Sequence, residues 1–405
     1  MNILALNCGS SSVKYALVRL DPAGGDRGAS SLARGLIDEI GSERSRLRHS
    51  SGPVSIDERA DTRDHEAAVR LVLRTLVDPG RGALADLSAI EVVGHRVVHG
   101  GAQFRNAALV DDAVLGAIRR CGVLAPLHNP HNMRGVEIAT ALLPHALQIV
   151  VFDTAFHADM PAEAATYALP LDLCERLGIR RYGFHGISHS FVAESAADEL
   201  GRPLDEIRLV TCHLGNGASV AAVKGGRAVD TSMGMTPLEG LVMGTRCGDL
   251  DPAIVLHLIE RGGLSTERAY ALLNEESGLL GLSGRSSDMR ELLQAAEAGD
   301  GAATLAVSLF CYRVRKYVGA YAAAMGGVDA VVFTGGIGEN EPTVRRLVCE
   351  GLGFLGVGVD DGANQAGRRR IGTGPVDVLV VATDEELAIA LEAGRVAADV
   401  GSGPA

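Results

Sequence analysis

Several features that often reveal a protein's biochemistry are absent from this sequence. Its seven cysteines include no Cys-x-x-Cys pair and are scattered through the 405 residues. This usage favours free thiols in a reducing compartment over a disulfide framework. No apolar run approaches membrane-spanning length, and the first residues carry no basic leader. We therefore expect a cytoplasmic protein with no membrane partner.

Positive charge is scarce as well. Fifty acidic residues against thirty-eight basic ones give a net charge of -12. Such a surface repels phosphate backbones and anionic lipid head groups, so no nucleic acid partner is expected. An acidic protein that binds anions must concentrate its positive charge locally, which draws attention to arginines and lysines beside glycine-rich turns.

The sequence also lacks two well-known nucleotide-binding signatures. It contains no Gly-x-x-x-x-Gly-Lys-Ser/Thr motif, which excludes a P-loop protein. Its Gly-x-Gly-x-x-Gly match at 351–356 follows a helical stretch rather than a strand, so we interpret it as a chance match. A dinucleotide-binding dehydrogenase therefore has no support.

The sequence does contain alternating strand and helix patterns. An apolar strand, a polar turn and a second strand at 3–20 recur in very similar form at 207–223. Helical periodicity marks further segments: 66–76, 190–200, 251–261, 302–325 and 385–398. Residues 21–65 read as loops and edge strands, and the tail 401–405 as frayed. The pattern predicts an α/β protein with a duplicated architecture.

The chain is long enough for two domains, each with its own core. We expect an N-terminal domain over 1–150 that holds the first strand-turn-strand unit. A larger domain over 151–384 would hold the second. A cleft between the two is where a ligand is expected.

Three glycine-rich turns could bind phosphate. They lie at 7–12, with Lys14 just beyond, at 215–219, and at 335–340 after the apolar strand 330–333. Small residues let backbone N–H groups approach a polyphosphate closely. One such turn is more often simply a tight turn. Three of them, each next to an apolar strand, favour a phosphate site.

Two arginines stand in unusual company, Arg96 in an apolar run and Arg246 among glycines. A guanidinium fork can bind a carboxylate or phosphate with two parallel hydrogen bonds, or it can pair with an acid of the protein itself. Asp153 ends an apolar strand, where it could serve magnesium or a nucleophile, or cap a helix. His185 lies between glycines, which suits contact with a phosphoryl group, although a lone histidine is more often structural.

Two other groups of residues invite a metal interpretation. The histidine pairs 95/99, 128/131 and 185/189 lack further ligands at zinc-motif spacing, so zinc is not expected. The acids at 384–386 begin a helix, where they could favour its N-terminus or coordinate magnesium.

Taken together, these segments resemble the acetate kinase family, part of the superfamily that includes sugar kinases, actin and the heat-shock ATPases. The matching motifs run in order through nearly the whole chain: Asn-Cys-Gly-Ser-Ser-Ser from 7, Gly-His-Arg-Val-Val-His-Gly-Gly from 94, Ala-Pro-Leu-His-Asn-Pro from 125, Phe-Asp-Thr-Ala-Phe-His from 152, Gly-Phe-His-Gly from 183, His-Leu-Gly-Asn-Gly-Ala-Ser from 213, Gly-Thr-Arg from 244, Gly-Asp-Leu-Asp-Pro from 248, Ser-Ser-Asp-Met-Arg from 286, Gly-Gly-Ile-Gly-Glu-Asn from 335 and Thr-Asp-Glu-Glu-Leu from 383.

The resemblance implies two ribonuclease-H-like domains of the actin/hexokinase type, with the C-terminal helix 385–400 rejoining the first domain. It also implies a homodimer. The implied reaction is reversible transfer of a phosphoryl group from ATP to acetate, giving ADP and acetyl phosphate, with Mg²⁺ (Mn²⁺ as an alternative). Small molecules would be the binding partners.

The resemblance further implies residue roles. The catalytic set is Asp153 as the essential acid, His185 and Arg246 at the transferring group, Arg96 at the acetate carboxylate and Asn216 at the γ-phosphate. The acetate methyl pocket would be lined by Val98, Leu127, Phe184 and Pro237. The nucleotide would be bound by Lys14, His213, Leu214, Gly215, Asn216, Gly217, Asp288, Met289, Arg290, Gly336, Ile337, Gly338, Glu339 and Asn340. Magnesium ligands or organisers would be Asn7 and Glu385.

Other functions remain open at this point. Propionate or butyrate kinase differs only by one or two methylenes, which change pocket affinity by about 1–3 kcal/mol. A sugar kinase would need polar residues around its substrate, and the apolar pocket disfavours it. A nucleotide-driven binding protein of the actin or chaperone type could use the same fold, but it needs no arginine for a carboxylate. Cys247 stands beside Arg246, so its oxidation could impair turnover.

Overall fold

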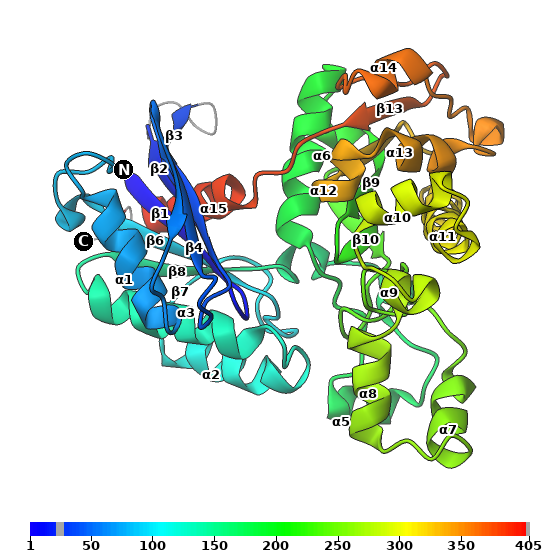
Figure 1. Ribbon diagram of the computed structural model, residues 1–405, viewed down its shortest axis with the longest axis horizontal. Helices are drawn as coiled ribbons and strands as arrows, with labels where there is room; N and C mark the ends of the chain where they lie inside the picture. Colours follow the sequence, from blue (N-terminus) through cyan, green and yellow to red (C-terminus); the bar gives the residue numbers. More distant parts are fainter. Residues whose placement is uncertain (22–27, 402–405) are drawn as a thin grey trace. The chain divides into compact units, whose positions relative to one another are not determined.

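The computed structural model describes residues 1–21 and 28–401. The chain divides into two compact units, residues 1–158 together with the C-terminal segment from Asp384, and Asp159–Thr383 (Figure 1). Residues 22–27 of the predicted loop region and 402–405 of the predicted tail lie outside the described residues. None of the helices in the described ranges is both long and apolar enough to span a bilayer.

The first unit is built on an eight-stranded sheet of order β5-β4-β3-β2-β1-β6-β8-β7. Strands β1 to β5 form an antiparallel meander, whereas β1, β6 and β8 run parallel. The strands are β1 (Asn2–Cys8), β2 (Val13–Leu20), β3 (Ala29–Asp38), β4 (Arg46–Ser51), β5 (Val54–Arg59), β6 (Val92–Val97), β7 (Ala108–Leu109) and β8 (Leu147–Phe152). The stretch predicted as loops and edge strands thus supplies three of them.

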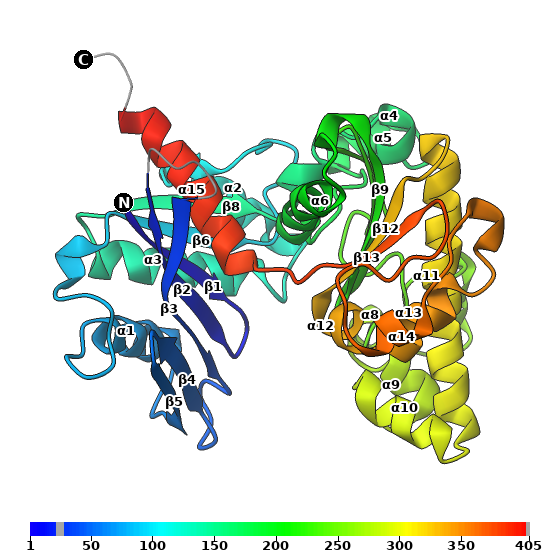
Figure 2. The same cartoon turned by 90° about the horizontal axis from the view of Figure 1, so that it is seen from above.

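Helices cover both faces of this sheet. Side chains such as Leu4 and Leu6 of β1 join a core with α1 and α3, while α15 packs against β1, β2, β6 and β8 (Figure 2). Gly94 allows this approach, because an added Cβ would lie 2.9 Å from a methyl group of Ile389. The helices are α1 (His65–Leu76), η2 (Leu87–Ala89), α2 (Asp112–Arg120), η3 (Cys121–Val123), α3 (Asn129–Leu142), η4 (Ala155–His157) and α15 (Glu385–Gly401).

The second unit is built on a five-stranded sheet of order β11-β10-β9-β12-β13. Its strands are β9 (Arg208–Leu214), β10 (Ala218–Lys224), β11 (Arg227–Thr231), β12 (Ala330–Thr334) and β13 (Asp377–Val380). The first three are antiparallel, and β9, β12 and β13 are parallel. The first unit repeats this arrangement as β3-β2-β1-β6-β8. The predicted duplication and the ribonuclease-H-like fold class are therefore confirmed.

The long helix α11 packs against β9, β10 and β11, and α6 packs against β9 and β12. The helices of this unit are α4 (Ala162–Ala165), α5 (Leu171–Leu177), α6 (Gly186–Leu200), η5 (Leu204–Glu206), α7 (Pro252–Glu260), α8 (Thr266–Glu275), α9 (Gly278–Ser283), α10 (Met289–Glu297), α11 (Gly301–Met325), α12 (Gly335–Asn340), α13 (Pro342–Cys349), η6 (Gly353–Leu355) and α14 (Asp361–Gln365). One prediction was wrong in detail, since the glycine-rich turn at 335–340 is the short helix α12.

Candidate functional site

The first unit brings Arg96 and Asp153 together. Strands β6 and β8 are neighbours in parallel register, with Val97 opposite Phe152, so the residue after β8 reaches the side chain near the end of β6. Arg96 donates from Nε to Oδ1 of Asp153 at 3.0 Å and from Nη2 to Oδ2 at 2.7 Å. Asp153 is 1% exposed. Of the two interpretations of Arg96, the structure shows it paired with an acid of its own chain.

Asn7 and Glu385 lie on the other side of the same guanidinium. Arg96 Nη1 is 3.5 Å from the amide oxygen of Asn7 and 3.6 Å from Oε2 of Glu385. Burial would lower the pKa of Arg96, but the charges of Asp153 and Glu385 outweigh it and raise the pKa. Arg96 thus remains a cation within a set of oxygen atoms. Asp153 does not cap a helix, since Thr154 is the N-cap of η4.

This oxygen set bears on the expected metal ion. Glu386, next to Glu385, has a buried Oε1 with no hydrogen-bond partner among the described residues. Burial and then the charge of Glu385 raise the pKa of Glu386, and Lys14 opposes them. Within residues 1–21 and 28–401, no group of three or more His, Cys, Asp or Glu side chains could hold a metal ion. The donors fit Mg²⁺ or Mn²⁺ only as a partial shell, which is usual where phosphate oxygens complete the coordination.

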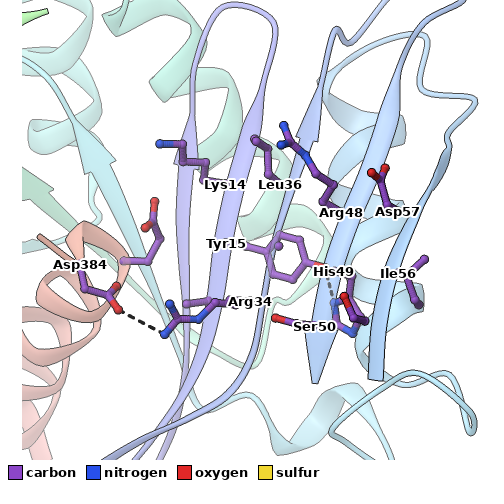
Figure 3. Close-up of a pocket in the computed structure, with 14 residues that line it drawn as sticks. Lys14, Tyr15, Arg34, Leu36, Arg48, His49, Ser50, Ile56, Asp57 and Asp384 are labelled. Atoms are coloured by element: carbon purple, nitrogen blue, oxygen red, sulfur yellow. Dashed lines mark hydrogen bonds and ion pairs between the residues drawn. The ribbon is translucent and has the colours of Figure 1, made fainter. Parts of the chain in front are cut away.

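Lys14 lies on β2 directly opposite Asn7 on β1. It borders a pocket of about 490 Å³ on the sheet face formed by β2 to β5, beside the start of α15 (Figure 3). Two other cations of the pocket are paired, Arg34 with Asp384 at 3.3 Å and Arg48 with Asp38 at 2.5 Å, and Glu386 also lines the pocket. The pocket is therefore polar and largely charge-balanced.

Val98 and Leu127, two residues predicted to contact the acetate methyl, have different environments. Val98 is 6% exposed, and its backbone N–H donates to Oδ1 of Asn132 at 3.1 Å. Leu127 is 37% exposed in the turn before α3. Val98 is therefore buried, whereas the side chain of Leu127 is partly open to solvent.

His185 occupies a strained position in the second unit. Its φ of 56° places it in the left-handed region at the N-cap of α6, which is costly for a residue with a Cβ. Its Nδ1 lies 2.9 Å from Oγ of Ser219, and its ring stacks on His213 at a centroid distance of 4.5 Å. These contacts fix the orientation of the ring. Its Nε2 atom lies close to Gly217, 3.4 Å from the position that a Cβ atom would occupy if that residue had one.

Arg246 reaches the same glycine from another segment. Its Nη1 lies 3.7 Å from that Cβ position on Gly217 and donates to the carbonyl oxygen of Pro237 at 3.3 Å. Burial lowers the pKa of Arg246. The segment that carries it is tied to the next candidate, because Gly244 N–H donates to the backbone oxygen of Asn216 at 2.9 Å. His185, Arg246, Asn216 and Gly217 thus converge within one unit.

The predicted nucleotide residues also cluster in the second unit. Strands β9 and β12 are parallel neighbours, with Thr334 opposite His213, so the segments that follow them lie at one sheet edge. There Glu339 Oε1 accepts hydrogen bonds from Gly335 N at 2.9 Å and Thr383 N at 3.1 Å. Asn340 Nδ2 donates back to Gly336 O at 2.9 Å. The residues 213–217 and 336–340 are therefore brought together.

The third predicted nucleotide segment begins helix α10. Asp288 caps this helix and pairs with Arg290, whose Nη2 lies 2.6 Å from Oδ2. Burial raises the pKa of Glu341, and Arg290 is the charge that most opposes this rise. Glu341 directly follows α12, and its charge interacts with that of Arg290. The segment 288–290 therefore lies near the end of α12.

Two serines that hold the histidines of the second unit escaped the sequence reasoning. Ser219 orients His185, and Ser188 Oγ lies 2.8 Å from Nδ1 of His213. Glu386 supplies a buried oxygen atom beside Lys14. Isolated serines carry no recognisable signal. Glu386 is one of the acids at 384–386 that the sequence marks as possible magnesium ligands, although only Glu385 was assigned to the metal.

The sequence as a whole is similar to that of known proteins. The model of the acetokinase family matches residues 2–391. The chain belongs to the acetokinase family. It is 50% identical over 408 residues to acetate kinase of Thermotoga maritima, covering 99% of this chain and 100% of that protein. It is also 50% identical over 396 residues to acetate kinase of Symbiobacterium thermophilum, covering 97% and 98%.

Solved structures of this acetokinase fold agree. The crystal structure of Porphyromonas gingivalis acetate kinase superposes with a TM-score of 0.89 at 45% identity, covering 98% of this chain and 99% of that one. A propionate kinase from Francisella tularensis gives a TM-score of 0.89 at 39% identity, covering 97% and 99%. The predicted family is therefore confirmed.

Proposed function

We propose that this protein is an acetate kinase, which transfers the γ-phosphoryl group of ATP to acetate reversibly and with Mg²⁺, giving ADP and acetyl phosphate. The observation that carries the proposal is the near-complete match to curated acetate kinases at 50% identity. Membership of the acetokinase family argues against an actin- or chaperone-type switch. All seven cysteines are free, as suits a reducing compartment, so the cytoplasm is its proposed location.

Arg96 is the proposed carboxylate anchor. A carboxylic acid with a pKa near 4 is ionised at neutral pH, so it attacks phosphorus without first losing a proton to a base. Asp153, held by two hydrogen bonds to Arg96, then acts as an organiser and not as a general base. Asn7 and Glu385 would hold the Mg²⁺, which when bound neutralises phosphate charge. Val98, Leu127, Phe184 and Pro237 would contact the methyl group.

His185 and Arg246 are the proposed stabilisers of the transferring group. Charge spreads over the phosphoryl oxygens in the transition state, and fixed donors that face them can each contribute about 3 kcal/mol. The ring of His185 is held by Ser219 and His213, so its orientation costs nothing at the moment of reaction. Asn216 would contact the γ-phosphate.

The nucleotide would be held by the two neighbouring glycine-rich segments of the second unit and by 288–290. Their backbone N–H groups suit a polyphosphate, because glycine allows close approach. Lys14 of the first unit would add a positive charge. We further propose domain motion that excludes water, which competes with acetate for phosphorus.

A propionate kinase is the second candidate. It is favoured by the propionate kinase neighbour, whose structure superposes as well as that of the acetate kinase. One methylene changes affinity by only about 1–3 kcal/mol. Comparing kcat/KM for acetate, propionate and butyrate decides between the two, and a preference for propionate would displace the first proposal.

A homodimer is proposed as well. Helix α7 is mostly apolar in sequence but has no buried residue, with Ile254 45% and Leu256 59% exposed. A second copy of the chain would cover such a surface. Light scattering after gel filtration should give twice the chain mass of 42.1 kDa, and a monomer at all concentrations would contradict this.

The activity is tested by mixing the protein with MgATP, acetate and hydroxylamine and measuring acetyl hydroxamate. We expect product with the native protein, and a loss of about 100-fold or more in kcat/KM for acetate in Arg96→Ala. Arg34→Ala is the matched control, because the pair that Arg34 forms with Asp384 is exposed. No hydroxamate from the native protein with any of the three acids would refute the function, and full activity of Arg96→Ala would refute the anchor.

A further inference from the structure

A partly buried ionic cluster lies in the second unit, apart from the residues discussed so far. It consists of Tyr167, Arg181 and Glu239, which we call the Arg181 cluster. Arg181 Nη2 lies 2.6 Å from Oε1 of Glu239, and the Tyr167 hydroxyl donates to the other carboxylate oxygen. The side chain of Arg181 is 17% exposed. Burial would lower the pKa of Arg181, but Glu239 outweighs it and raises the pKa.

The guanidinium of Arg181 also binds backbone. Its Nη1 faces three successive carbonyl oxygens, those of Thr231 at 3.0 Å, Ser232 at 3.4 Å and Met233 at 3.3 Å. The planar fork of arginine spans these carbonyls and a carboxylate at once, which the single ammonium of lysine does not. Tyr167 extends the same contacts by accepting from the N–H of Met235 at 3.0 Å. The cluster therefore holds the segment 231–235 at several points.

This arrangement joins two segments that carry proposed substrate residues. Tyr182 and Gly183 donate their N–H groups to the carbonyl of Gly234 at 3.0 and 3.3 Å. The segment 181–185 contains Phe184 and His185, and the segment 231–239 contains Pro237. The Arg181 cluster thus links the backbone on both sides of these residues.

Arg246 depends on the same anchored backbone. Its Nη1 donates to the carbonyl of Pro237, which lies between the held segment 231–235 and Glu239. The backbone just after Glu239 is held as well. The Asp249 carboxylate accepts hydrogen bonds from Gly240 N at 2.9 Å and from the Tyr317 hydroxyl at 2.8 Å. A shift of the Arg181 cluster would therefore move Pro237 and the guanidinium of Arg246 together.

We propose that Tyr167, Arg181 and Glu239 are positioning residues that set Pro237 and Arg246 relative to His185, and so control carboxylate use and phosphoryl transfer but not nucleotide affinity. This inference rests on the proposed function of Pro237 and Arg246. No residue of the cluster needs to touch a substrate. Small displacements of reacting groups cost large factors in rate, so an anchor outside the site can govern catalysis.

The test uses Tyr167→Phe as the mild variant and Arg181→Lys as the stronger one. We expect kcat/KM for acetate to fall about tenfold in the first and about 100-fold in the second, while KM for ATP stays within about twofold. Asp329→Asn is the matched control, because Asp329 pairs with Arg202 and Arg208 in the same unit and accepts a backbone N–H. Its melting temperature should fall with kcat/KM unchanged.

Two results would overturn the inference. One is a fall in melting temperature like that of the control with native kinetics, and the other is an equal rise in KM for ATP and acetate. Amide hydrogen exchange gives a readout that needs no activity, with faster exchange expected over 231–240 in Tyr167→Phe. Unchanged exchange there refutes the anchor, whereas an inactive native protein with the expected exchange refutes only the proposed function.

Discussion

Arg96 and Arg246 lie in different units and in opposite electrostatic surroundings. Arg96 is bound by the Asp153 carboxylate and lies near Glu385, and its pKa is raised. Arg246 donates to the carbonyl of Pro237 and lies near the sulfur of Met243, and its pKa is lowered by burial. An arginine surrounded by acids is a fixed part of a charged scaffold. Pro237 and Met243 offer Arg246 uncharged acceptors instead, which suits its proposed role as a donor to a phosphoryl group.

The largest expected effect tests this contrast directly. Replacing Arg246 by alanine should lower kcat about 1,000-fold, because it removes the proposed donor to the transferring phosphoryl group. KM for ATP should change little. Arg96→Ala should instead act mainly through the KM for acetate. Steady-state kinetics of both variants measure the difference, and identical patterns would show that the two arginines do the same work.

The next effect concerns stability. Asp153→Asn leaves the partly buried Arg96 without its main counter-charge, so the free energy of unfolding should fall by about 3 kcal/mol in urea denaturation. Asp384→Asn is the control, since its pair with Arg34 is exposed and asparagine can still cap α15. That change should cost less than about 1 kcal/mol. Equal losses would mean that burial does not distinguish the pairs.

The pH dependence of the first unit gives a third test. Burial lowers the pKa of His95 from 6.5 to about 4, and a bond to Gln148 only partly opposes this. Below pH 6.5 the unfolded chain takes up a proton that the folded protein does not, so stability falls as pH drops towards 4. The loss should reach about 3 kcal/mol. His95→Gln should flatten the profile of melting temperature against pH, and parallel profiles would contradict this.

The smallest effect is expected at Cys247, whose proximity to Arg246 in sequence suggested redox sensitivity. Burial raises the pKa of its thiol to about 11, which leaves roughly one part in ten thousand as thiolate at pH 7. Iodoacetamide at pH 7 should therefore modify it slowly, as followed by mass spectrometry. Cys247→Ser should keep kcat within about twofold, and rapid alkylation with loss of activity would restore the redox interpretation.

Much of the fold could be predicted from periodicity, because its strands and helices bury regular apolar patterns. Helix α12 could not. Glycines are poor helix formers, so 335–340 reads as a turn. In the structure Gly335 adopts a φ of 78°, and the Glu339 carboxylate accepts its N–H. A side chain one turn away stabilises a helix that local propensity disfavours.

For the candidate site, the sequence predicts individual residues but not how their side chains pair. The motifs identify Arg96 and Asp153, yet their ion pair spans 57 positions and depends on the register of β6 and β8. The Arg181 cluster escaped notice for a similar reason. Tyr167, Arg181 and Glu239 are ordinary surface-type residues in sequence, and only the fold of segments far apart in the chain brings them together.

Because α15 packs against β6 at Gly94, the two units complete their folds in a particular order during translation. The first unit to leave the ribosome lacks one of its covering helices until synthesis has passed residue 401, whereas every strand of the second unit has been translated by residue 380. The earlier-synthesised half is therefore completed last. Premature termination would leave a nascent chain without Glu385 and with an uncovered sheet face, a natural target for quality control.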